Sequence, residues 1–299
     1  MRMIAVINGD SGTLRTLDID AFCGVITGLF ADEGKELSCV VAEGRNIAST
    51  LDRAFGEDRT QGVIIAGGDG TLSAAAERAW QSGKLLGVLP GGTMNLFARS
   101  LGMPMEMTEA AAALAKGVED RSDIATANGR PFLHQFSVGF QPRMVKLRER
   151  QNYRSRLGKL AASAMAALDS IRRPPSYRVD LEIDGKRHSS RLSSLAISNN
   201  PFGEGHMPYA DAVNTGRLGV YLARPASHAT NARMLADMML GTWRTNPDIS
   251  EFEAHRVVAR FPERKRHASA AIDGELVDLE RSIEIDIHPG ELKVLRPSG

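Results

Sequence analysis

The chain has 299 residues, of which 42% are hydrophobic, so it can bury a sizeable core in two domains or in one large one. Its 37 basic and 36 acidic side chains leave a formal net charge of +1, so no global field favours nucleic acid and we expect no nucleic-acid partner. The longest apolar stretch, residues 160–168, is too short to span a bilayer.

The start of the chain has the pattern of a buried strand rather than of a signal peptide. The two cysteines, Cys23 and Cys39, match neither a metal-binding spacing nor a disulfide framework. Both suit the interior of a first domain in a reducing compartment. These features predict a cytoplasmic protein.

Short apolar runs alternate with helical patterns over the first 120 residues. The patterns predict strands at 4–7, 37–41, 63–66 and 85–89, and helices at 19–32, 47–55, 72–81 and 93–101. Strands separated by helices of this length imply a parallel sheet with helices on both faces. We therefore expect a three-layer α/β domain of the nucleotide-binding type.

The pattern of predicted strands and helices changes after about residue 122. Strands are predicted at 132–140, 177–183, 191–197, 218–222, 253–259, 268–272 and 283–287, with helices at 154–171 and 229–240. Turn signals such as Asp184-Gly185, Thr215-Gly216 and Asp273-Gly274 separate the strands. This half is predicted to be an antiparallel β-sandwich.

Three loops of the first half have the composition of phosphate-binding loops. The most informative runs from a buried strand through Gly67, Gly68 and Gly70 into a helix, so backbone N–H groups and the helix N-terminus can approach an anion closely. The others are the segment Asn8–Thr13 and the segment Leu89–Asn95, in which Thr93 is a natural N-cap. Because all three follow strands of one parallel sheet, they are expected to converge on a single anion site that binds a nucleotide.

The same loops resemble the motifs of a known family. Asn8-Gly-Asp-Ser-Gly12, Gly67-Gly-Asp-Gly-Thr71 and Pro90-Gly-Gly-Thr-Met-Asn95 are similar to those of the diacylglycerol kinase catalytic family, which includes bacterial soluble lipid kinases, sphingosine kinases and ceramide kinases. The similarity continues through Asp123 and Asp273-Gly-Glu275 and covers nearly the whole chain. It implies a nucleotide-binding domain at 1–122, a β-sandwich domain for the lipid substrate at 123–282, and a tail at 283–299 that packs back on the first domain.

The resemblance also implies site residues and cofactors. The implied ATP-binding residues are Asn8, Gly9, Asp10, Ser11, Gly12, Gly67, Gly68, Asp69, Gly70, Thr71, Gly92, Thr93 and Asn95. Asp273 is the expected catalytic base, with Glu275 next, because a lipid hydroxyl needs a carboxylate to accept its proton as it attacks the γ-phosphorus. Mg²⁺ is expected to accompany ATP.

The chain departs from the family pattern where relatives carry acidic residues. Leu96, Asn214 and Thr215 occupy such positions. Of the carboxylates expected to bind a structural Mg²⁺, only Asp123 and Asp211 therefore remain. Asp69 is an alternative ligand for Mg²⁺ or for the hydroxyl group.

A lipid substrate implies contact with a membrane surface. Seven basic residues lie between Arg143 and Lys159, interrupted by one acid, Glu149. Anionic headgroups attract such segments by about 1 kcal/mol per basic residue. The basic run therefore has two equally supported interpretations, peripheral membrane association and a solvated helix face. A homodimer is also possible.

The leading hypothesis is transfer of the ATP γ-phosphate to the hydroxyl group of diacylglycerol. Ceramide or a sphingoid base is an alternative substrate. NAD kinase, which shares the Gly-Gly-Asp-Gly-Thr turn, is a rival enzyme, and a binding regulator without catalysis is a rival of another class.

Overall fold

The computed structural model describes residues 1–12, 14–149, 176–225, 227–264 and 266–298. The chain forms two compact units. The first consists of Met1–Ile124, Ala212–Thr215 and His288–Gly299, and the second of Ala125–Asp211 and Gly216–Ile287.

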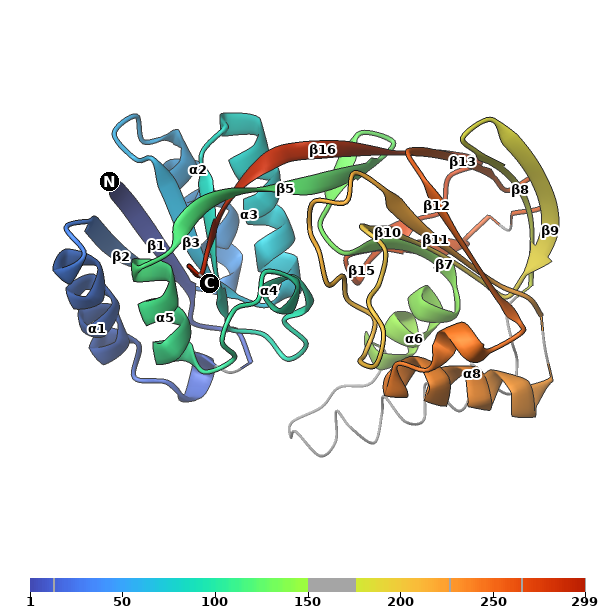
Figure 1. Ribbon diagram of the computed structural model, residues 1–299, viewed down its shortest axis with the longest axis horizontal. Coiled ribbons are helices and arrows are strands. Elements are labelled where there is room, and N and C mark those ends of the chain that lie inside the picture. The colour runs from blue at the N-terminus through green and yellow to red at the C-terminus, as the bar shows by residue number, and fades with distance from the viewer. Residues whose placement is uncertain (13, 150–175, 226, 265, 299) are drawn as a thin grey trace. The chain divides into compact units, whose positions relative to one another are not determined.

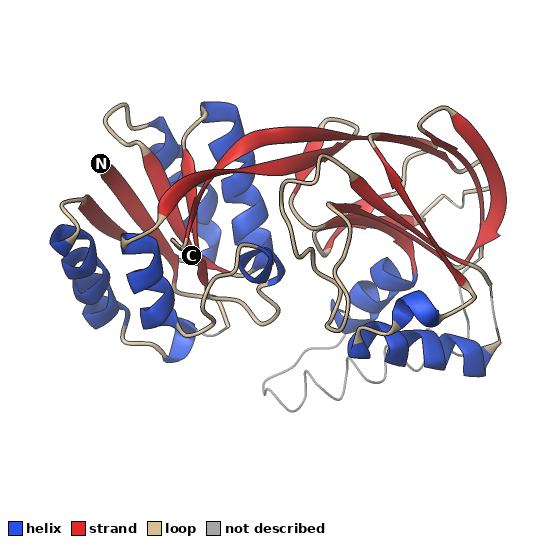
Figure 2. Ribbon diagram, in the orientation of Figure 1, coloured by secondary structure: helices blue, strands red, loops and turns tan. Residues whose placement is uncertain are grey.

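The first unit is a parallel sheet covered by helices on both faces (Figure 1, Figure 2). Its strands are β1 (Arg2–Asn8), β2 (Glu36–Ala42), β3 (Gly62–Gly67), β4 (Leu85–Pro90) and the end of β16 (Ser282–Arg296), in the order β2-β1-β3-β4-β16. Its helices are α1 (Ile19–Asp32), α2 (Ile47–Gly56), α3 (Asp69–Ser82), α4 (Leu96–Ser100) and α5 (Met107–Ala115), with short 3₁₀ turns η1 (Leu14–Thr16) and η2 (Gly44–Asn46). Every residue of β3 and β4 is buried, as expected for parallel strands with helices on both faces.

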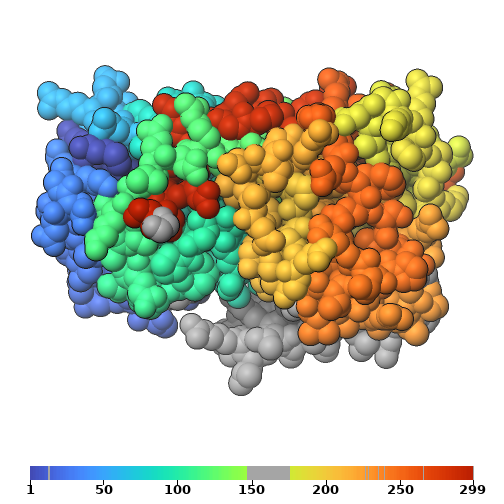
Figure 3. Space-filling view, viewed as in Figure 1, coloured from blue at the N-terminus to red at the C-terminus, as the bar shows by residue number. Residues whose placement is uncertain are grey.

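The C-terminal residues are part of this first unit. Val294 of β16 pairs with Leu86 of β4 in parallel, and Arg296 forms an ion pair with Asp120 at 2.9 Å. In the space-filling view the C-terminal residues lie against the surface of residues around α5 and the start of β5 (Val118–Ala127) (Figure 3).

The second unit is a sandwich of two antiparallel sheets. One contains the start of β16, β13 (Arg256–Arg260), β8 (Tyr177–Ile183) and β9 (Lys186–Leu192), with the end of β5 paired to β6 (Arg130–Phe132). The other has the order β12 (Ile249–Ala254), β11 (Leu218–Ala223), β10 (Ser194–Asn199), β7 (Gln135–Gly139), β14 (Ser269–Ile272) and β15 (Glu275–Asp278). Helices α6 (Phe140–Glu149) and α8 (His228–Leu240) and the turn η3 (Trp243–Thr245) complete the unit.

Alternate residues of both sheets fill the core between them. Phe136, Ile197 and Val220 come from one sheet and meet Leu181 and Val257 of the other. Such alternation of inward apolar residues is typical of a sandwich. The predicted fold class, a parallel α/β domain followed by an antiparallel β-sandwich, is confirmed.

Three predicted strands are in fact interrupted. The segment 132–140 contains the end of β6, the strand β7 and the first residue of α6, because Gly139 (φ 100°) ends β7. The segment 191–197 is split at Ser193, which bonds to the carbonyls of Ala223 and Arg224 instead of continuing the strand. The segment 253–259 is split at His255, whose N–H donates to the Asp184 carboxylate.

The prediction for the two cysteines is wrong. Cys23 of α1 and Cys39 of β2 form a disulfide, with their Cα atoms 5.7 Å apart. This separation lies within the range that a disulfide spans. Helix α1 packs directly against β2, and this tertiary contact cannot be read from the spacing of two cysteines.

The predicted helix at 154–171 and most of the basic run of 143–159 lie outside the described residues. Within the described residues, no helix is both long and apolar enough to cross a bilayer.

Candidate functional site: three glycine loops and a buried aspartate

The first predicted loop begins where β1 ends. The buried Asn8 donates from Nδ2 to the hydroxyl of Thr71 (2.9 Å), and its Oδ1 accepts the N–H of Asp10 (3.2 Å). The carboxylate of Asp10 in turn accepts the N–H of Gly44 (2.7 Å), and Gly9 donates to the carbonyl of Ala42 (3.0 Å). These bonds tie the first loop both to the end of β2 and to the start of α3.

The second loop joins β3 directly to α3. Gly68 is the N-cap, and Asp69, Gly70 and Thr71 form the first turn of α3, which therefore begins three residues earlier than predicted. The N–H groups of a first turn have no helical acceptors, and they carry the positive end of the helix dipole. The turn therefore presents donors suited to a phosphate group.

The third loop lies against the second through paired glycines. A Cβ atom on Gly91 would come within 2.7 Å of the nitrogen of Gly67, and a Cβ on Gly92 within 2.8 Å of the Cα of Gly68. Real Cβ atoms do not approach backbone this closely, so the third loop can lie against the second only because it has glycine at positions 91 and 92.

Ser11 and Gly12 complete the cluster. The Ser11 hydroxyl donates to the carbonyl of Gly91 (2.8 Å), and the hydroxyl of Thr93 lies 3.8 Å from where a Cβ on Gly12 would stand. The three predicted loops are therefore neighbours at the carboxyl ends of β1, β3 and β4.

The predicted helix start at Thr93 is wrong. Asn95 is the N-cap residue, in a left-handed conformation (φ 51°), and α4 begins at Leu96. The Asn95 side chain accepts the N–H of Gly92 (2.8 Å) and donates to its carbonyl (3.1 Å), which closes a tight ring that a helix cannot include. Thr93 is left exposed at the surface of the loop.

Asp273 lies in the turn between β14 and β15, in the second unit. It is 9% exposed and has φ of 47°. Its carboxylate accepts the backbone N–H groups of Leu133 (2.9 Å), His134 (2.8 Å) and Gln135 (3.0 Å). These bonds fix the orientation of the carboxylate before any substrate arrives.

Glu275 differs from Asp273 in its surroundings. Its side chain is about half exposed and pairs with Arg130 at 2.9 Å. An exposed, ion-paired carboxylate is a weaker candidate for a base than a buried carboxylate held by backbone donors.

His134 packs beside Asp273 and was not predicted. Burial lowers the pKa of His134 to about 4, although the negative charge of Asp273 opposes this shift. The imidazole is therefore neutral at pH 7, and its ring lies 5.3 Å from that of Phe202.

Two of the predicted metal ligands bond to other groups. The Asp123 carboxylate accepts the N–H of Gly290 (2.8 Å), and Asp211 pairs with His206 (2.8 Å) in the other unit. Among the described residues, no group of three histidine, cysteine or acidic side chains is placed to hold a metal ion. The roles of Asp69, Asp123 and Asp211 toward Mg²⁺ stay predictions.

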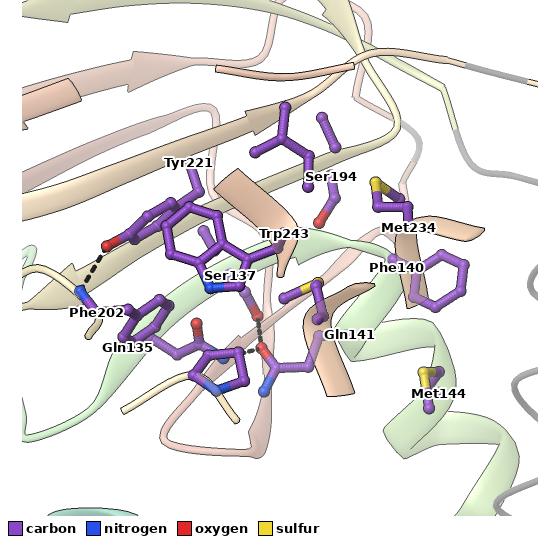
Figure 4. A pocket seen from close by; sticks show the side chains of 15 residues that line it. Gln135, Ser137, Phe140, Gln141, Met144, Ser194, Phe202, Tyr221, Met234 and Trp243 are labelled. Carbon is purple, nitrogen blue, oxygen red and sulfur yellow. Dashed lines mark hydrogen bonds between the residues drawn. The ribbon is translucent and has the colours of Figure 1, made fainter. Parts of the chain in front are cut away.

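A second feature of the sandwich unit is an apolar cavity of about 200 Å³ (Figure 4). Its floor is the outer face of the six-stranded sheet, and its walls come from α6, α8, η3 and the loop after β10. The lining residues are Gln135, Ser137, Phe140, Gln141, Met144, Ser194, Ala196, Phe202, Pro208, Tyr221, Ala223, Met234, Met238, Trp243 and Ile249.

The cavity follows from the alternation of the strands. In β10, Leu195 and Ile197 point into the core, whereas Ser194 and Ala196 point to the cavity. Small side chains on this outer face leave space beneath the helices. Sequence reasoning did not find the cavity, although an outer strand face without charged residues was a signal for it.

Comparison with known proteins agrees with the fold of the two units. Residues 2–127 match the model of the diacylglycerol kinase catalytic domain, and residues 136–296 match that of the YegS C-terminal NAD kinase beta sandwich-like domain. A diacylglycerol kinase of Bacillus subtilis is 28% identical over 237 residues, which cover 75% of this chain and 76% of that protein.

Two further proteins are similar over most of the chain. An uncharacterized protein of Synechocystis is 25% identical over 86% of this chain, and the match spans 60% of that protein's length. A crystal structure of a diacylglycerol kinase from Bacillus anthracis aligns with a TM-score of 0.72 and 18% identity, covering 99% of this chain and 96% of that one, and so shows a shared fold. Since the two models together account for most of the sequence, the chain belongs to the family that joins a diacylglycerol kinase catalytic domain to a YegS-type C-terminal sandwich domain.

Proposed function

We propose that the protein transfers the γ-phosphate of ATP to the hydroxyl group of a lipid, with diacylglycerol as the substrate and phosphatidic acid as the product. The observation that carries this proposal is the glycine cradle formed by Gly67–Gly68 and Gly91–Gly92. A side chain at position 91 or 92 would push the two loops apart, so these glycines keep the loop backbones together at the strand ends, where backbone N–H groups suit the triphosphate of a nucleotide.

Each part of the cradle has a separate task. The first turn of α3 donates backbone N–H groups to phosphate oxygens. Thr71 keeps its position through the bond from Asn8, and its side chain lies beside Gly67. The nucleotide supplies the phosphoryl group, and the Mg²⁺ that travels with it neutralises phosphate charge.

We propose that Asp69 would contact that Mg²⁺, because it is the acidic residue of the first turn of α3. Mg²⁺ in kinases is usually bound through one or two carboxylates together with substrate phosphates. Asp123 and Asp211 are each engaged with another group, so no step is assigned to a structural metal ion.

Asp273 is the proposed base. In the reaction the lipid oxygen forms a bond to the γ-phosphorus, the bond from that phosphorus to the ADP oxygen breaks, and Asp273 accepts the hydroxyl proton. The three backbone donors hold the carboxylate in one orientation, which lowers the entropic cost of alignment.

A second candidate function is NAD kinase, because the matched C-terminal model describes a sandwich like that of NAD kinase. The apolar cavity favours the lipid reaction, since a dinucleotide offers no hydrocarbon to fill it.

Transfer of labelled γ-phosphate into a panel of lipids in mixed micelles tests the proposal. The panel contains diacylglycerol, monoacylglycerol, ceramide and sphingosine. Labelled phosphatidic acid is the expected product. ATP binding without a labelled product from any lipid would instead support a regulator without catalysis, and label in NADP would support NAD kinase.

A further inference from the structure

The first of the three glycine loops lies between two elements that a disulfide joins. The loop leaves the end of β1 and leads through η1 into α1, and β1 pairs with β2 along its whole length. Cys23 of α1 and Cys39 of β2 form the disulfide. The covalent bond therefore connects the helix that follows the loop to the strand that flanks it (Figure 1).

Both elements reach Gly9 of this loop on the faces that carry the cysteines. A Cβ built on Gly9 would lie 3.4 Å from Cδ1 of Ile19 and 3.7 Å from Cγ1 of Val41. Ile19 precedes Cys23 by four residues in α1, so the two share a helix face. Val41 follows Cys39 by two residues in β2, so the two share a strand face. The disulfide and the contacts at Gly9 therefore belong to one interface between helix and strand.

Hydrogen bonds from the end of β2 hold the same loop. Gly9 donates to the carbonyl of Ala42 (3.0 Å), and the Asp10 carboxylate accepts the N–H of Gly44 (2.7 Å). Strand β2 is the edge strand in the order β2-β1-β3-β4-β16, so within the described chain β1 is its one strand partner. The positions of Ala42 and Gly44 therefore depend on β1 and on the packing of α1 that the disulfide fixes.

The disulfide is accessible to a reductant. Cys23 and Cys39 are both partly exposed, and the residues beside them, Gly24, Val25 and Val40, are exposed. A thiolate in solution can attack a disulfide that is accessible in this way. In a reducing compartment, disulfides are usually transient and take part in catalysis or in redox sensing.

We propose that the Cys23–Cys39 disulfide is a reversible redox site that controls the affinity of the protein for its nucleotide. A dithiol reductant attacks the bond, a mixed disulfide forms, and the second thiol of the reductant displaces the remaining cysteine. Two electrons and two protons pass to the protein, which gains two thiols, while the reductant becomes a disulfide. Once the bond is open, α1 and β2 are free to separate beside Gly9, and the first loop loses the geometry that suits ATP.

This inference rests on the proposed function, because ATP is the ligand whose affinity changes. The oxidised protein binds ATP with the loop held in place, and the reduced protein binds it only in the fraction of molecules whose loop has that geometry. Loss of one hydrogen bond that holds the loop corresponds to a Kd that is about 3- to 10-fold weaker. At low ATP concentration, phosphate transfer is therefore faster under oxidising conditions.

Calorimetric titration with ATP compares the full chain in its two redox states. Both cysteines of the chain are in the bond, so a thiol titration should count no thiol in the oxidised protein and two after dithiothreitol. Circular dichroism in the near ultraviolet verifies that both states are folded. Reduction should raise the Kd for ATP about 3- to 10-fold, and reoxidation should restore it. Cys23→Ser/Cys39→Ser should show the weaker Kd with or without dithiothreitol.

A control variant and a second measurement separate this effect from a general loss of stability. Leu292→Ala removes a fully buried side chain from β16, at the opposite end of the strand order from β2. This variant should be less stable, yet it should keep the native Kd and the native response to dithiothreitol. Amide exchange of Gly9 and Gly44, followed by NMR without ATP, should become faster when the native protein is reduced but not in oxidised Leu292→Ala.

Equal ATP affinity in the two folded redox states would overturn the inference and leave the kinase proposal intact. A bond that dithiothreitol does not open in the folded protein would also overturn it, as would an equally weakened Kd in oxidised Leu292→Ala. Absence of ATP binding in both states would instead contradict the proposed function. In that case, faster exchange of Gly9 on reduction would support redox control of the loop, and unchanged exchange would overturn it.

Discussion

Asp273 and Asp184 have nearly the same geometry in two different hairpins. Their φ angles are 47° and 45°, and each is followed by a glycine with φ near 80°. Both carboxylates accept backbone N–H groups from a neighbouring segment, for Asp184 those of His255 (3.0 Å) and Arg256 (2.9 Å). The two differ in exposure, since Asp273 is 9% exposed and Asp184 lies at the surface. The chain therefore contains its own control for a catalytic role of Asp273.

Asp273→Asn should lower kcat by about 10²- to 10⁴-fold, because the amide cannot accept the proton of the lipid hydroxyl. Asp184→Asn should retain the native kcat. Both variants weaken hydrogen bonds to backbone donors, and the decrease in Tm should be larger for the buried Asp273 than for the exposed Asp184. Steady-state phosphorylation of dioleoylglycerol and thermal unfolding of the two proteins provide the comparison. Equal loss of kcat in both, or none in Asp273→Asn, would remove Asp273 as the base.

Gly91→Ala should abolish ATP binding, because the added Cβ would meet the backbone nitrogen of Gly67 at 2.7 Å and the side chain of Leu14 at 2.9 Å. The matched substitution is Gly28→Ala in α1, where a Cβ meets nothing within 4 Å. That change should stabilise the protein by about 0.5–1 kcal/mol. Calorimetric titration with ATP and urea unfolding measure the two effects. Native ATP affinity in Gly91→Ala would show that the two loops need not approach so closely.

The protein should lose stability on mild acidification, in part through His134. Its pKa is about 4 in the folded protein and 6.5 in the unfolded chain, so between these values the unfolded chain binds more protons. The His134 contribution is complete above about pH 6.5 and should fall by about 2 kcal/mol between pH 7 and pH 5. Urea unfolding at both pH values should show a smaller difference for His134→Gln than for the native protein. If His134→Gln and the native protein lose the same stability between pH 7 and pH 5, the acid sensitivity arises from other residues.

Reduction of the Cys23–Cys39 disulfide should destabilise the first unit. The bond closes a sequence separation of 16 residues, for which the loss of loop entropy in the unfolded chain corresponds to about 3 kcal/mol. The double variant Cys23→Ser/Cys39→Ser should unfold at the same urea concentration with and without dithiothreitol, whereas the native protein should unfold earlier in dithiothreitol. A native protein indifferent to the reductant would contradict this expectation.

The sequence predicts the parts of this structure that depend on local pattern. Strands β3 and β4 are continuous apolar runs. The glycines at 67, 68, 91 and 92 predict that the loops after these strands approach each other or a ligand closely. The antiparallel half is also recognisable from its turns, since Asp184-Gly185 and Asp273-Gly274 both end in left-handed glycines.

The remainder depends on contacts between distant segments. The hydrogen bonds between Asn95 and Gly92 make Asn95 the N-cap in place of Thr93. The packing of α1 on β2 brings Cys23 and Cys39 close enough to form a disulfide. The cavity is least visible of all, because it requires small residues on several strands to face α6 and α8 at once.

The most direct test of the proposed function is a single reaction that offers the native protein both candidate acceptors. The reaction contains γ-labelled ATP, Mg²⁺, dioleoylglycerol in mixed micelles and NAD, and the label is followed into phosphatidic acid and into NADP. The account predicts label in phosphatidic acid, at a rate that Asp273→Asn lowers at least about 100-fold. Label in NADP, or ATP bound without transfer to either acceptor, would contradict it.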